Sequence, residues 1–325
     1  MSALAAVRTA VRNFLASIEV PGEVCVAVSG GADSVALAAA TAYVARSRGF
    51  RTRALVIDHG LQDGSADVAA EAAAVVQKLG VEVAEVRAVD VASEGGPEAA
   101  ARTARYRALR EALSDSEGLV LLGHTLDDQA ETVLLGLGRG SGPRSLAGMR
   151  SYDPPWGRPL LGVTRAQTQG ACVELGVQPW QDPHNADPRF TRVRLRGEVL
   201  PLLEDVLAGG VAPALARTAA QLRDDTEALD TLAARVHERA ERAGELETTV
   251  LAAEPAALRR RVLRRWLLDS GVRELTDAHL RSVDALVARW RGQGGVWLPG
   301  NLEARRCHGR LSLAGPQPEP TTRGE

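Results

Sequence analysis

A loop over residues 29–34, with the sequence Ser-Gly-Gly-Ala-Asp-Ser, carries the residue types of a phosphate-binding site, and we call it the phosphate loop. An apolar run, Val24–Val28, precedes it, and alanine-rich helical sequence begins at Val35. The first N–H groups of a helix have no partner within the helix, and the helix dipole adds partial positive charge there. The two glycines let the backbone approach an anion closely, and the two serines add hydroxyl donors. We therefore expect phosphate to contact Ser29, Gly30, Gly31, Ala32, Asp33 and Ser34.

Asp33 indicates that a cation accompanies the phosphate. A carboxylate repels a phosphate unless a cation lies between them, and Mg²⁺ bound to a nucleotide meets that need. Asp33 is therefore the predicted metal ligand. The loop is not a Walker A motif, because the chain contains no G-x-x-x-x-G-K-[ST] sequence and its only lysine is Lys78. The alternative is an ordinary glycine-rich turn between a strand and a helix.

A second polar segment, over residues 124–132, lies where an apolar run gives way to helical sequence. Asp128 and Glu131 share one helix face, so these paired carboxylates can hold a cationic substrate or Mg²⁺. Part of the pattern has a structural alternative, since Thr125 and Asp128 fit a capping box. That alternative does not account for the remaining polar residues, His124, Asp127 and Glu131.

Two smaller groups of polar residues are further candidates. Arg102 and Arg105 lie on one face of a predicted helix, although exposed arginines on an amphipathic helix are the simpler interpretation. Asp58 and His59 follow the second predicted strand, where doubly wound sheets meet a nucleoside. A histidine in an ordinary turn is the alternative for His59.

Strand-like and helical runs alternate along the first part of the chain. Strands are predicted at 24–28, 53–57, 81–86 and 119–123, and helices at 35–47, 67–79 and 97–113. This alternation is typical of an α/β fold with a parallel, doubly wound sheet covered by helices. Ligands of such sheets bind beyond the carboxyl ends of the strands, which is where the polar segments lie.

We expect two domains and a tail. Residues 1–205 form the α/β domain, residues 206–316 form a smaller, mostly helical domain that ends in a β-hairpin, and residues 317–325 form a flexible tail. Alternating glycines over 136–142, followed by Pro154 and Pro155, predict a mobile loop over 136–159 in the first domain.

The composition excludes several classes of protein. Of 325 residues, 45% are apolar and 25% are charged. Cys25, Cys172 and Cys307 are far apart and the six histidines are scattered, which argues against a structural zinc, an iron–sulfur cluster or a disulfide framework. No segment resembles a signal peptide or reaches the ~18 uncharged apolar residues of a membrane span. We therefore expect a cytoplasmic protein without a membrane partner.

The net charge of −2 does not by itself suggest a nucleic-acid partner, but arginines cluster locally. One cluster lies at 189–196 and another at 259–265. Arginine forks bind phosphate well, so both clusters are candidate phosphate contacts. For each cluster the alternative is a solvated helix face.

The phosphate loop looks like the PP-loop of ATP pyrophosphatases, and the chain resembles the tRNA(Ile)-lysidine synthetase family. Seven motifs carry the resemblance: S-G-G-x-D-S, D-H-G-L, E-x-x-A-R-x-x-R-Y, H-H-x-D-D-Q-A-E-T, R-G-S-G, R-P-L-L and a late arginine-rich stretch. They occur in this order at 29–34, 58–61, 98–106, 124–132, 139–142, 158–161 and 182–196. Thr125 departs from the pattern by replacing the second histidine of H-H, and Val193 replaces an amide residue.

The resemblance implies a ligase that uses ATP and Mg²⁺ to join L-lysine to the wobble cytidine of a tRNA(Ile) with a CAU anticodon. In that family the C2 oxygen of the cytidine attacks the α-phosphorus, pyrophosphate leaves, and the lysine ε-amine then displaces AMP. The implied catalytic residues are Asp33, Arg102, Arg105, His124, Asp127, Asp128 and Glu131. Asp127 or Asp128 is a candidate base for the amine.

The same resemblance implies three sets of binding residues. ATP is bound by the phosphate loop together with Asp58 and His59. Lysine is bound by Asp128, Glu131 and Arg102, and the tRNA by Arg139, Arg189, Arg192, Arg194 and Arg196. A homodimer is also among the expected assemblies.

Two alternatives stay open. The first is another PP-loop enzyme that modifies tRNA or forms amides, although thiolation normally needs a cysteine pair and amidation an ammonia source. The second is a non-catalytic sensor of adenine nucleotides, which would bind ATP without releasing pyrophosphate.

Overall fold

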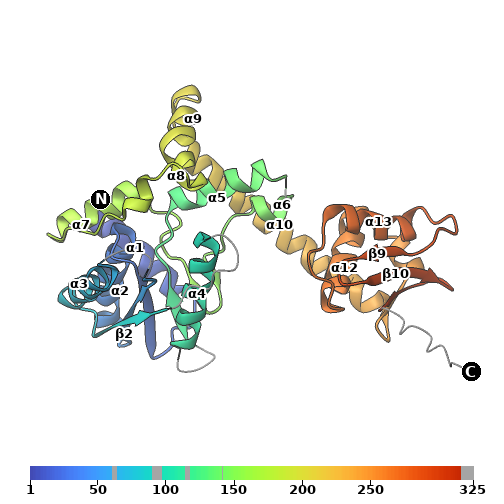
Figure 1. Ribbon diagram of the computed structural model, residues 1–325, viewed down its shortest axis with the longest axis horizontal. Helices are drawn as coiled ribbons and strands as arrows, with labels where there is room; N and C mark the ends of the chain where they lie inside the picture. The colour runs from blue at the N-terminus through green and yellow to red at the C-terminus, as the bar shows by residue number, and fades with distance from the viewer. Residues whose placement is uncertain (61–63, 90–96, 114–117, 141, 316–325) are drawn as a thin grey trace, which may run out of the picture. The chain divides into compact units, whose positions relative to one another are not determined.

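The computed structural model describes residues 1–60, 64–89, 97–113, 118–140 and 142–315 (Figure 1). The chain divides into two compact units, Met1–Leu222 and Arg223–Glu325. The dividing point lies within the long helix α10 (Val211–Ala240), whereas the sequence analysis places the boundary after residue 205. The predicted tail, 317–325, lies outside the described residues.

The first unit contains a six-stranded sheet with the strand order β3-β2-β1-β4-β6-β5. Its strands are β1 (Glu23–Val28), β2 (Arg51–Asp58), β3 (Val83–Ala88), β4 (Leu119–Leu121), β5 (Tyr152–Asp153) and β6 (Trp156–Gly157). Neighbouring strands are parallel except β5 and β6, which form a short antiparallel pair. The predicted parallel sheet is confirmed, but β5 and β6 were not predicted because two-residue strands carry no periodicity.

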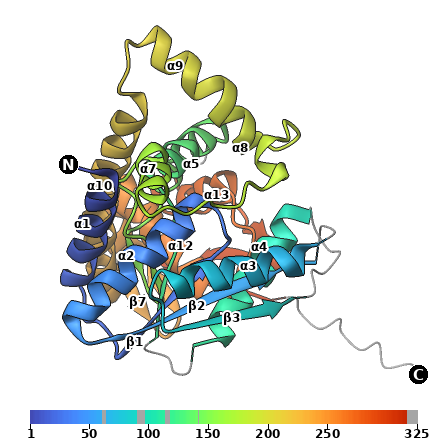
Figure 2. The same ribbon diagram turned by 90° about the vertical axis from the view of Figure 1, so that its left-hand side faces the viewer.

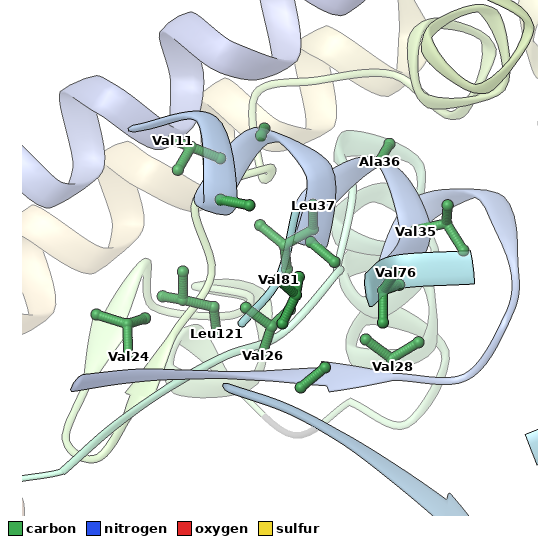
Figure 3. Packing of buried hydrophobic residues seen from close by; sticks show 14 of the residues in the cluster. Val11, Val24, Val26, Val28, Val35, Ala36, Leu37, Val76, Val81 and Leu121 are labelled. Atoms are coloured by element: carbon green, nitrogen blue, oxygen red, sulfur yellow. The ribbon is translucent and has the colours of Figure 1, made fainter. Parts of the chain in front are cut away.

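Helices cover both faces of this sheet, as a doubly wound fold requires (Figure 2). One face carries α1 (Ala3–Ala16), α2 (Ala32–Arg48), α3 (Ser65–Lys78) and α7 (Arg165–Glu174), and the other carries α4 (Pro97–Glu111). Alternate residues of β1 belong to different cores. Val24, Val26 and Val28 face α2 (Figure 3), whereas Cys25 belongs to the core under α4. Strand β1 is buried on both faces, which explains its continuous apolar run.

The segment after β4 contains α5 (Leu126–Gly138) and α6 (Pro143–Leu146). The predicted mobile loop is therefore wrong for Gly136 and Gly138, which lie within α5. A Cβ at Gly136 would lie 2.6 Å from the carbonyl oxygen of Ser145. Glycine at this position allows α5 and the segment around α6 to pack closely.

The first unit ends in a series of short helical segments. They are a 3₁₀ helix (Pro183–Ala186), α8 (Thr191–Arg194), a π-helical segment (Leu195–Val199) and α9 (Leu200–Val206). Leu200 of α9 packs with Ala130 of α5 and Val211 of α10. Among the described residues, no single helix is long and apolar enough to cross a membrane, and only the pair Thr191–Val206 and Val211–Ala240, bent by 95°, has that length and composition.

The strand order reverses between β1 and β4, so the loops that follow these two strands lie side by side. Gly123 shows how close they are. A Cβ at Gly123 would lie 3.1 Å from both the carbonyl carbon of Asp33 and the backbone nitrogen of Ser34. The phosphate loop and the start of α5 therefore share one crevice, where doubly wound sheets bind their ligands.

Replacement of Gly123 by alanine is expected to weaken nucleotide binding. The added methyl group meets backbone atoms, so the N-terminus of α2 must shift. Overpacking of this kind costs about 1–3 kcal/mol, which corresponds to a loss of ATP affinity between about five-fold and about 150-fold, measured by calorimetry. Gly22→Ala is the control, because nothing lies within 4 Å of its Cβ. Equal ATP affinities of the two variants would contradict this expectation.

The second unit combines helices with a five-stranded antiparallel sheet of order β7-β8-β11-β10-β9. Its strands are β7 (Glu241–Arg242), β8 (Glu245–Glu247), β9 (Val296–Leu298), β10 (Leu302–Cys307) and β11 (Arg310–Ala314). Its helices are the end of α10, α11 (Thr248–Ala252), α12 (Ala256–Asp269) and α13 (Asp277–Ala288). The sheet is larger than the predicted hairpin because β8 pairs with β11 across a long stretch of sequence.

The arginine cluster at 259–265 forms ion pairs within the second unit. Arg259 is buried and pairs with Asp284, and Arg260 Nε lies 3.0 Å from the same carboxylate. Arg261 Nη1 lies 2.7 Å from Asp230 Oδ1. These contacts stabilise the packing around α12 and favour the structural alternative for these three arginines.

Candidate active site

The phosphate loop is held in shape by its own serines. The hydroxyl of Ser34 donates to the carbonyl of Gly31 (2.9 Å) and accepts from the N–H of Ser29 (3.1 Å). Gly30 has a φ of +82°, a conformation that favours glycine, and its carbonyl accepts the N–H of Trp180 at 3.0 Å. Because Gly31 is the N-cap of α2, the loop presents a helix N-terminus to an anion.

The carboxylate of Asp33, in the first turn of α2, has two partners. Thr168 donates its hydroxyl to Oδ1, and Arg165 Nε lies 3.5 Å from Oδ2. Burial raises the pKa of Asp33, while the bond from Thr168 and the charge of Arg165 partly offset that rise. The charged form of Asp33 therefore depends on cations nearby.

Helix α5 begins with the predicted capping box, in which Thr125 is a buried N-cap. Asp128 Oδ2 accepts from the backbone N–H of Thr125 (2.8 Å) and from its hydroxyl (2.9 Å). Asp127 contacts α7 instead, because its Oδ2 accepts the backbone N–H of Arg165 at 2.7 Å. Capping thus occupies one oxygen of Asp128, while its Oδ1 lies 2.8 Å from Arg165 Nη2.

Glu131 is fully buried and surrounded by arginines. Its carboxylate lies 2.8 Å from Arg196 Nε, 3.5 Å from Arg192 Nη1 and 3.7 Å from Arg165 Nη1. Glu131 is a predicted contact of the substrate amine, and Arg192 and Arg196 are predicted contacts of tRNA phosphates. The structure brings these three residues together, so the geometry favours a role for Glu131 in positioning the arginines.

Two residues that the sequence analysis did not single out, Arg165 and Thr168, join the two halves of the crevice. Both contact Asp33, and Arg165 also contacts Asp128. Burial opposes the charge of Arg165, but the surrounding acids, Asp128 first among them, raise its pKa above the usual value. The sequence does contain one local indication of this position. Thr164 and Gln167 fit a capping box, which places Arg165 at the first position of helix α7.

His124 lies between β4 and α5 and is half-buried. Its Nδ1 is buried and has no hydrogen-bond partner among the residues that the structure describes. Burial lowers the pKa of His124 to about 4; Asp128 opposes this shift, and Arg158, Arg102 and Arg192 reinforce it. The imidazole is therefore neutral at physiological pH, within a group of arginines that suits an anionic ligand.

The buried, neutral state of His124 makes stability depend on pH. Its folded-state pKa lies below the unfolded value of 6.5, so the unfolded chain binds the proton first, and stability falls as the pH drops from about 6.5 toward 4. His124→Asn removes this loss, which amounts to about 2 kcal/mol between pH 7.5 and pH 5. Urea unfolding of both proteins at the two pH values measures the difference. An equal decrease in the two proteins would show that folding does not lower the pKa of His124.

The remaining predicted ATP and lysine contacts lie on α4 and after β2. Arg105 Nε lies 3.5 Å from His59 Nε2. Arg102 lies over the ring of Tyr106, 4.9 Å from its centroid. Asp58 Oδ1 accepts a backbone N–H two residues along the chain at 2.9 Å, which fixes the turn after β2. Arg102 also acts electrostatically on His124, so α4 contributes positive charge to the crevice.

Three of the predicted tRNA contacts are not gathered around the acids of the crevice. Arg139 is the exposed C-cap of α5, at the opposite end of the helix from Asp128. Arg189 pairs with Asp187 at 2.6 Å, and Arg194 pairs with Glu198 at 2.9 Å. In both pairs the arginine side chain is exposed, so it is accessible to a ligand.

The fold and this site define a protein with a PP-loop domain. Residues 4–203 match the family model of the PP-loop domain, and residues 246–312 match that of the TilS substrate binding domain. A U34-tRNA thiolase from Methanococcus maripaludis has a similar structure, with a TM-score of 0.55 over 68% of this chain and 78% of that chain. At 16% sequence identity this likeness shows the fold alone.

Curated relatives define the family within that class. The tRNA(Ile)-lysidine synthase of Rhodococcus jostii (strain RHA1) is 58% identical over 96% of this chain and 95% of its own length. Those of Nocardia farcinica (strain IFM 10152) and Mycobacterium tuberculosis (strain ATCC 25618 / H37Rv) are 59% and 56% identical, over 94% of this chain and 96% and 94% of theirs. The chain belongs to the tRNA(Ile)-lysidine synthase family, which confirms the resemblance inferred from its motifs.

Proposed function

We propose that this protein is an ATP-dependent ligase that joins L-lysine to C2 of the wobble cytidine of a CAU-anticodon tRNA(Ile), through an adenylated cytidine. One observation supports this most directly: Asp33 of the phosphate loop and Asp128 of α5 contact the same guanidinium group, that of Arg165. The carboxylate proposed to act at ATP and the carboxylate proposed to bind the amine are therefore close enough to contact one arginine side chain. A two-step transfer on one bound cytidine needs this proximity.

In the first step the cytidine C2 oxygen attacks the α-phosphorus of ATP, and pyrophosphate leaves. The backbone N–H groups at the start of α2 bind phosphate oxygens and hold the nucleotide in place. Of the two arginines of α4, Arg105 is assigned to the leaving pyrophosphate, and Arg102 to the carboxylate of the lysine substrate. Positioning and charge neutralisation supply most of the catalysis in such transfers.

Asp33 is the residue that fits a magnesium ion. Mg²⁺ bound with a nucleotide commonly uses one or two protein carboxylates and completes its shell with phosphate oxygens and water. Asp33 Oδ1 is held by Thr168, and its Oδ2 lies 3.5 Å from the nearest arginine nitrogen, longer than an ordinary hydrogen bond. Mg²⁺ would neutralise the charge that develops on the pyrophosphate.

In the second step the lysine ε-amine attacks C2 of the adenylated cytidine and AMP leaves. Asp128 Oδ1 faces the crevice and is assigned to the substrate amine. Asp127 is bonded to the N–H of Arg165, so we assign it to the placement of α7 and prefer Asp128 as the group that receives the amine. Arg102 of α4 completes the proposed lysine site at the substrate carboxylate. Glu131, which the sequence also predicts for lysine, is fully buried among arginines, so we assign it to holding the arginines that border Asp128.

The tRNA is proposed to contact both the arginine cluster of the first unit and the second unit. Single-stranded loops are the part of RNA whose bases can be drawn into a pocket, which suits a wobble cytidine. Arg139, Arg189 and Arg194 are exposed and can meet backbone phosphates. Residues 246–312, in the second unit, match a substrate-binding domain.

Pyrophosphate release and incorporation of radiolabelled lysine test the proposal together. The assay contains ATP, Mg²⁺ and a tRNA(Ile) transcript with a CAU anticodon, and a tRNA(Met) transcript is the control. Release and incorporation that both require tRNA(Ile) are expected. Release without incorporation would indicate a different modification of tRNA, and ATP binding without release would indicate a nucleotide sensor.

The cysteines argue against a thiolase. Burial raises the pKa of Cys25 to about 12 and that of Cys172 to about 11. Both thiols belong to hydrophobic cores, where the reactive thiolate is disfavoured. Cys307 belongs to the second unit.

A further inference from the structure

Arg165 contacts acids from both loops of the crevice. Its Nη2 lies 2.8 Å from Asp128 Oδ1, and its Nε lies 3.5 Å from Asp33 Oδ2. Asp33 follows β1 and Asp128 follows β4, so the two acids come from opposite sides of the point where the strand order reverses. The proposed ATP and lysine subsites therefore have a counter-ion in common.

Asp33 and Asp128 share the same arrangement of partners. In each carboxylate a threonine fixes one oxygen, with Thr168 bonded to Asp33 Oδ1 and Thr125 bonded to Asp128 Oδ2. The other oxygen of each acid faces Arg165. The oxygen that a ligand's cation would use is thus the oxygen that the guanidinium contacts.

The backbone of Arg165 is fixed, whereas its guanidinium can exchange partners. Its N–H is bonded to Asp127 Oδ2 at 2.7 Å, at the capped start of α7. The side chain is 19% exposed, so a ligand in the crevice can reach it. Its contact with Asp33 is longer than an ordinary hydrogen bond, which leaves Nε available to a better acceptor.

We propose, on the basis of the lysidine-forming function above, that Arg165 couples ATP binding to lysine binding. Phosphate at the phosphate loop draws the guanidinium away from Asp128. Asp128 Oδ1 then keeps the more distant Arg196, at 3.7 Å, and its closest position becomes available to the substrate amine. An arginine fork fits a phosphate in a bidentate manner, and a nucleotide phosphate chain carries more negative charge than one carboxylate. Glu131 keeps Arg196 as a partner after the exchange.

This role makes Arg165 a positioning residue that acts through Asp128. The coupling is reciprocal, because any factor by which ATP raises the affinity for lysine is also the factor by which lysine raises the affinity for ATP. A side chain that only supports the fold would lower both affinities and leave their ratio unchanged.

Lysine binding without catalysis tests the proposal on the full-length protein. Equilibrium dialysis with radiolabelled lysine is carried out without tRNA, with and without a non-hydrolysable ATP analogue and Mg²⁺. For the unmodified protein the analogue should raise the lysine affinity by about five-fold or more, a typical size for coupling between sites.

Arg165→Met should remove the coupling in a specific direction. Without the guanidinium, Asp128 Oδ1 has lost its closest cation, so lysine should bind more tightly than to the unmodified protein when no nucleotide is present. The analogue should then have no further effect. Arg165→Lys keeps the charge, but an ammonium group cannot contact both acids as a guanidinium fork does. The ratio of its lysine affinities with and without the analogue should therefore be intermediate. This variant replaces Arg165→Met if the methionine variant does not fold.

Arg53→Met is the matched control. Arg53 is also a mostly buried arginine of the first unit, and it pairs with Glu23 at 3.1 Å and Glu85 at 3.7 Å, both on strands of the sheet. The Arg53→Met variant should show the same increase in lysine affinity on addition of the analogue as the unmodified protein. An unchanged ratio in the Arg165 variants, or weaker lysine binding in both conditions, would overturn the proposal.

The proposed function is tested by lysidine formation, and the coupling is tested by lysine binding, so the two can fail independently. If the unmodified protein forms lysidine on tRNA(Ile) but shows no effect of the analogue on lysine binding, the coupling is wrong and the function stands. If it forms no lysidine, the function fails whatever the binding data show.

Discussion

Replacing Asp33 by asparagine should reduce kcat/KM for pyrophosphate release by about 10²–10³-fold, the usual cost of removing one electrostatic group from such a site. Asparagine has the shape of aspartate, and its carbonyl can still accept the bond from Thr168. What disappears is the negative charge that the proposed Mg²⁺ needs and that the Arg165 guanidinium faces. The loss should therefore appear in catalysis, with little change in the unfolding midpoint.

Asp67→Asn is the control for this variant. Asp67 lies in the first turn of α3, as Asp33 does in the first turn of α2, but it is exposed. It should retain full activity. Steady-state pyrophosphate release over a range of Mg²⁺ concentrations measures both variants, and Asp33→Asn should need more Mg²⁺ for half-maximal rate. An Asp33→Asn enzyme with the original Mg²⁺ dependence would remove Asp33 from the metal site.

Glu131→Gln should destabilise the first unit by about 3–5 kcal/mol, since breaking a buried ion pair leaves an uncompensated charge. Glu131 is fully buried, and its neutral replacement faces Arg165, Arg192 and Arg196. The three guanidinium groups then repel one another without a central anion. Activity should fall as well, because two of these arginines also contact Asp128.

Glu198→Gln provides the comparison for Glu131→Gln. Glu198 also pairs with an arginine, Arg194 at 2.9 Å, but its side chain is 53% exposed. Water and salt screen such a pair, so its loss should shift the unfolding midpoint far less than Glu131→Gln does. Urea unfolding followed by circular dichroism gives both values. Equal midpoints for the two variants would mean that the buried ion pairs of Glu131 contribute no more to stability than the exposed pair of Glu198.

The sequence predicts elements whose patterns are local and long, and it fails for elements that tertiary contacts create. Alternating strands and helices identify the parallel sheet because β1 and β2 each carry a continuous apolar run. Strands β7 and β8 have two and three residues and exist because β8 pairs with the distant β11. The glycines at 136–142 suggest a loop, although Gly136 lies within helix α5 and allows it to pack closely against Ser145 of α6.

The same distinction applies to the site. Residues on one segment, such as those of the phosphate loop or Asp127, Asp128 and Glu131, stand out by type and spacing. Arg165 and Thr168 do not, because what brings them to Asp33 is the packing of α7 against α2. Likewise, the arginines at 189–196 look available for phosphate in the sequence. The pairing of Arg192 and Arg196 with Glu131 of α5 depends on the folded chain and leaves no trace in the local sequence.

The arginines of the 189–196 segment have a consequence for how RNA meets this protein. Arg189 and Arg194 pair with the acids that flank this segment, Asp187 and Glu198. Arg192 and Arg196 pair with Glu131. Such a surface has little net charge, so a tRNA bound to it would release few condensed counter-ions. Recognition here would depend on the fit of individual guanidinium groups and only weakly on ionic strength, which disfavours capture of RNAs that offer charge without the matching shape.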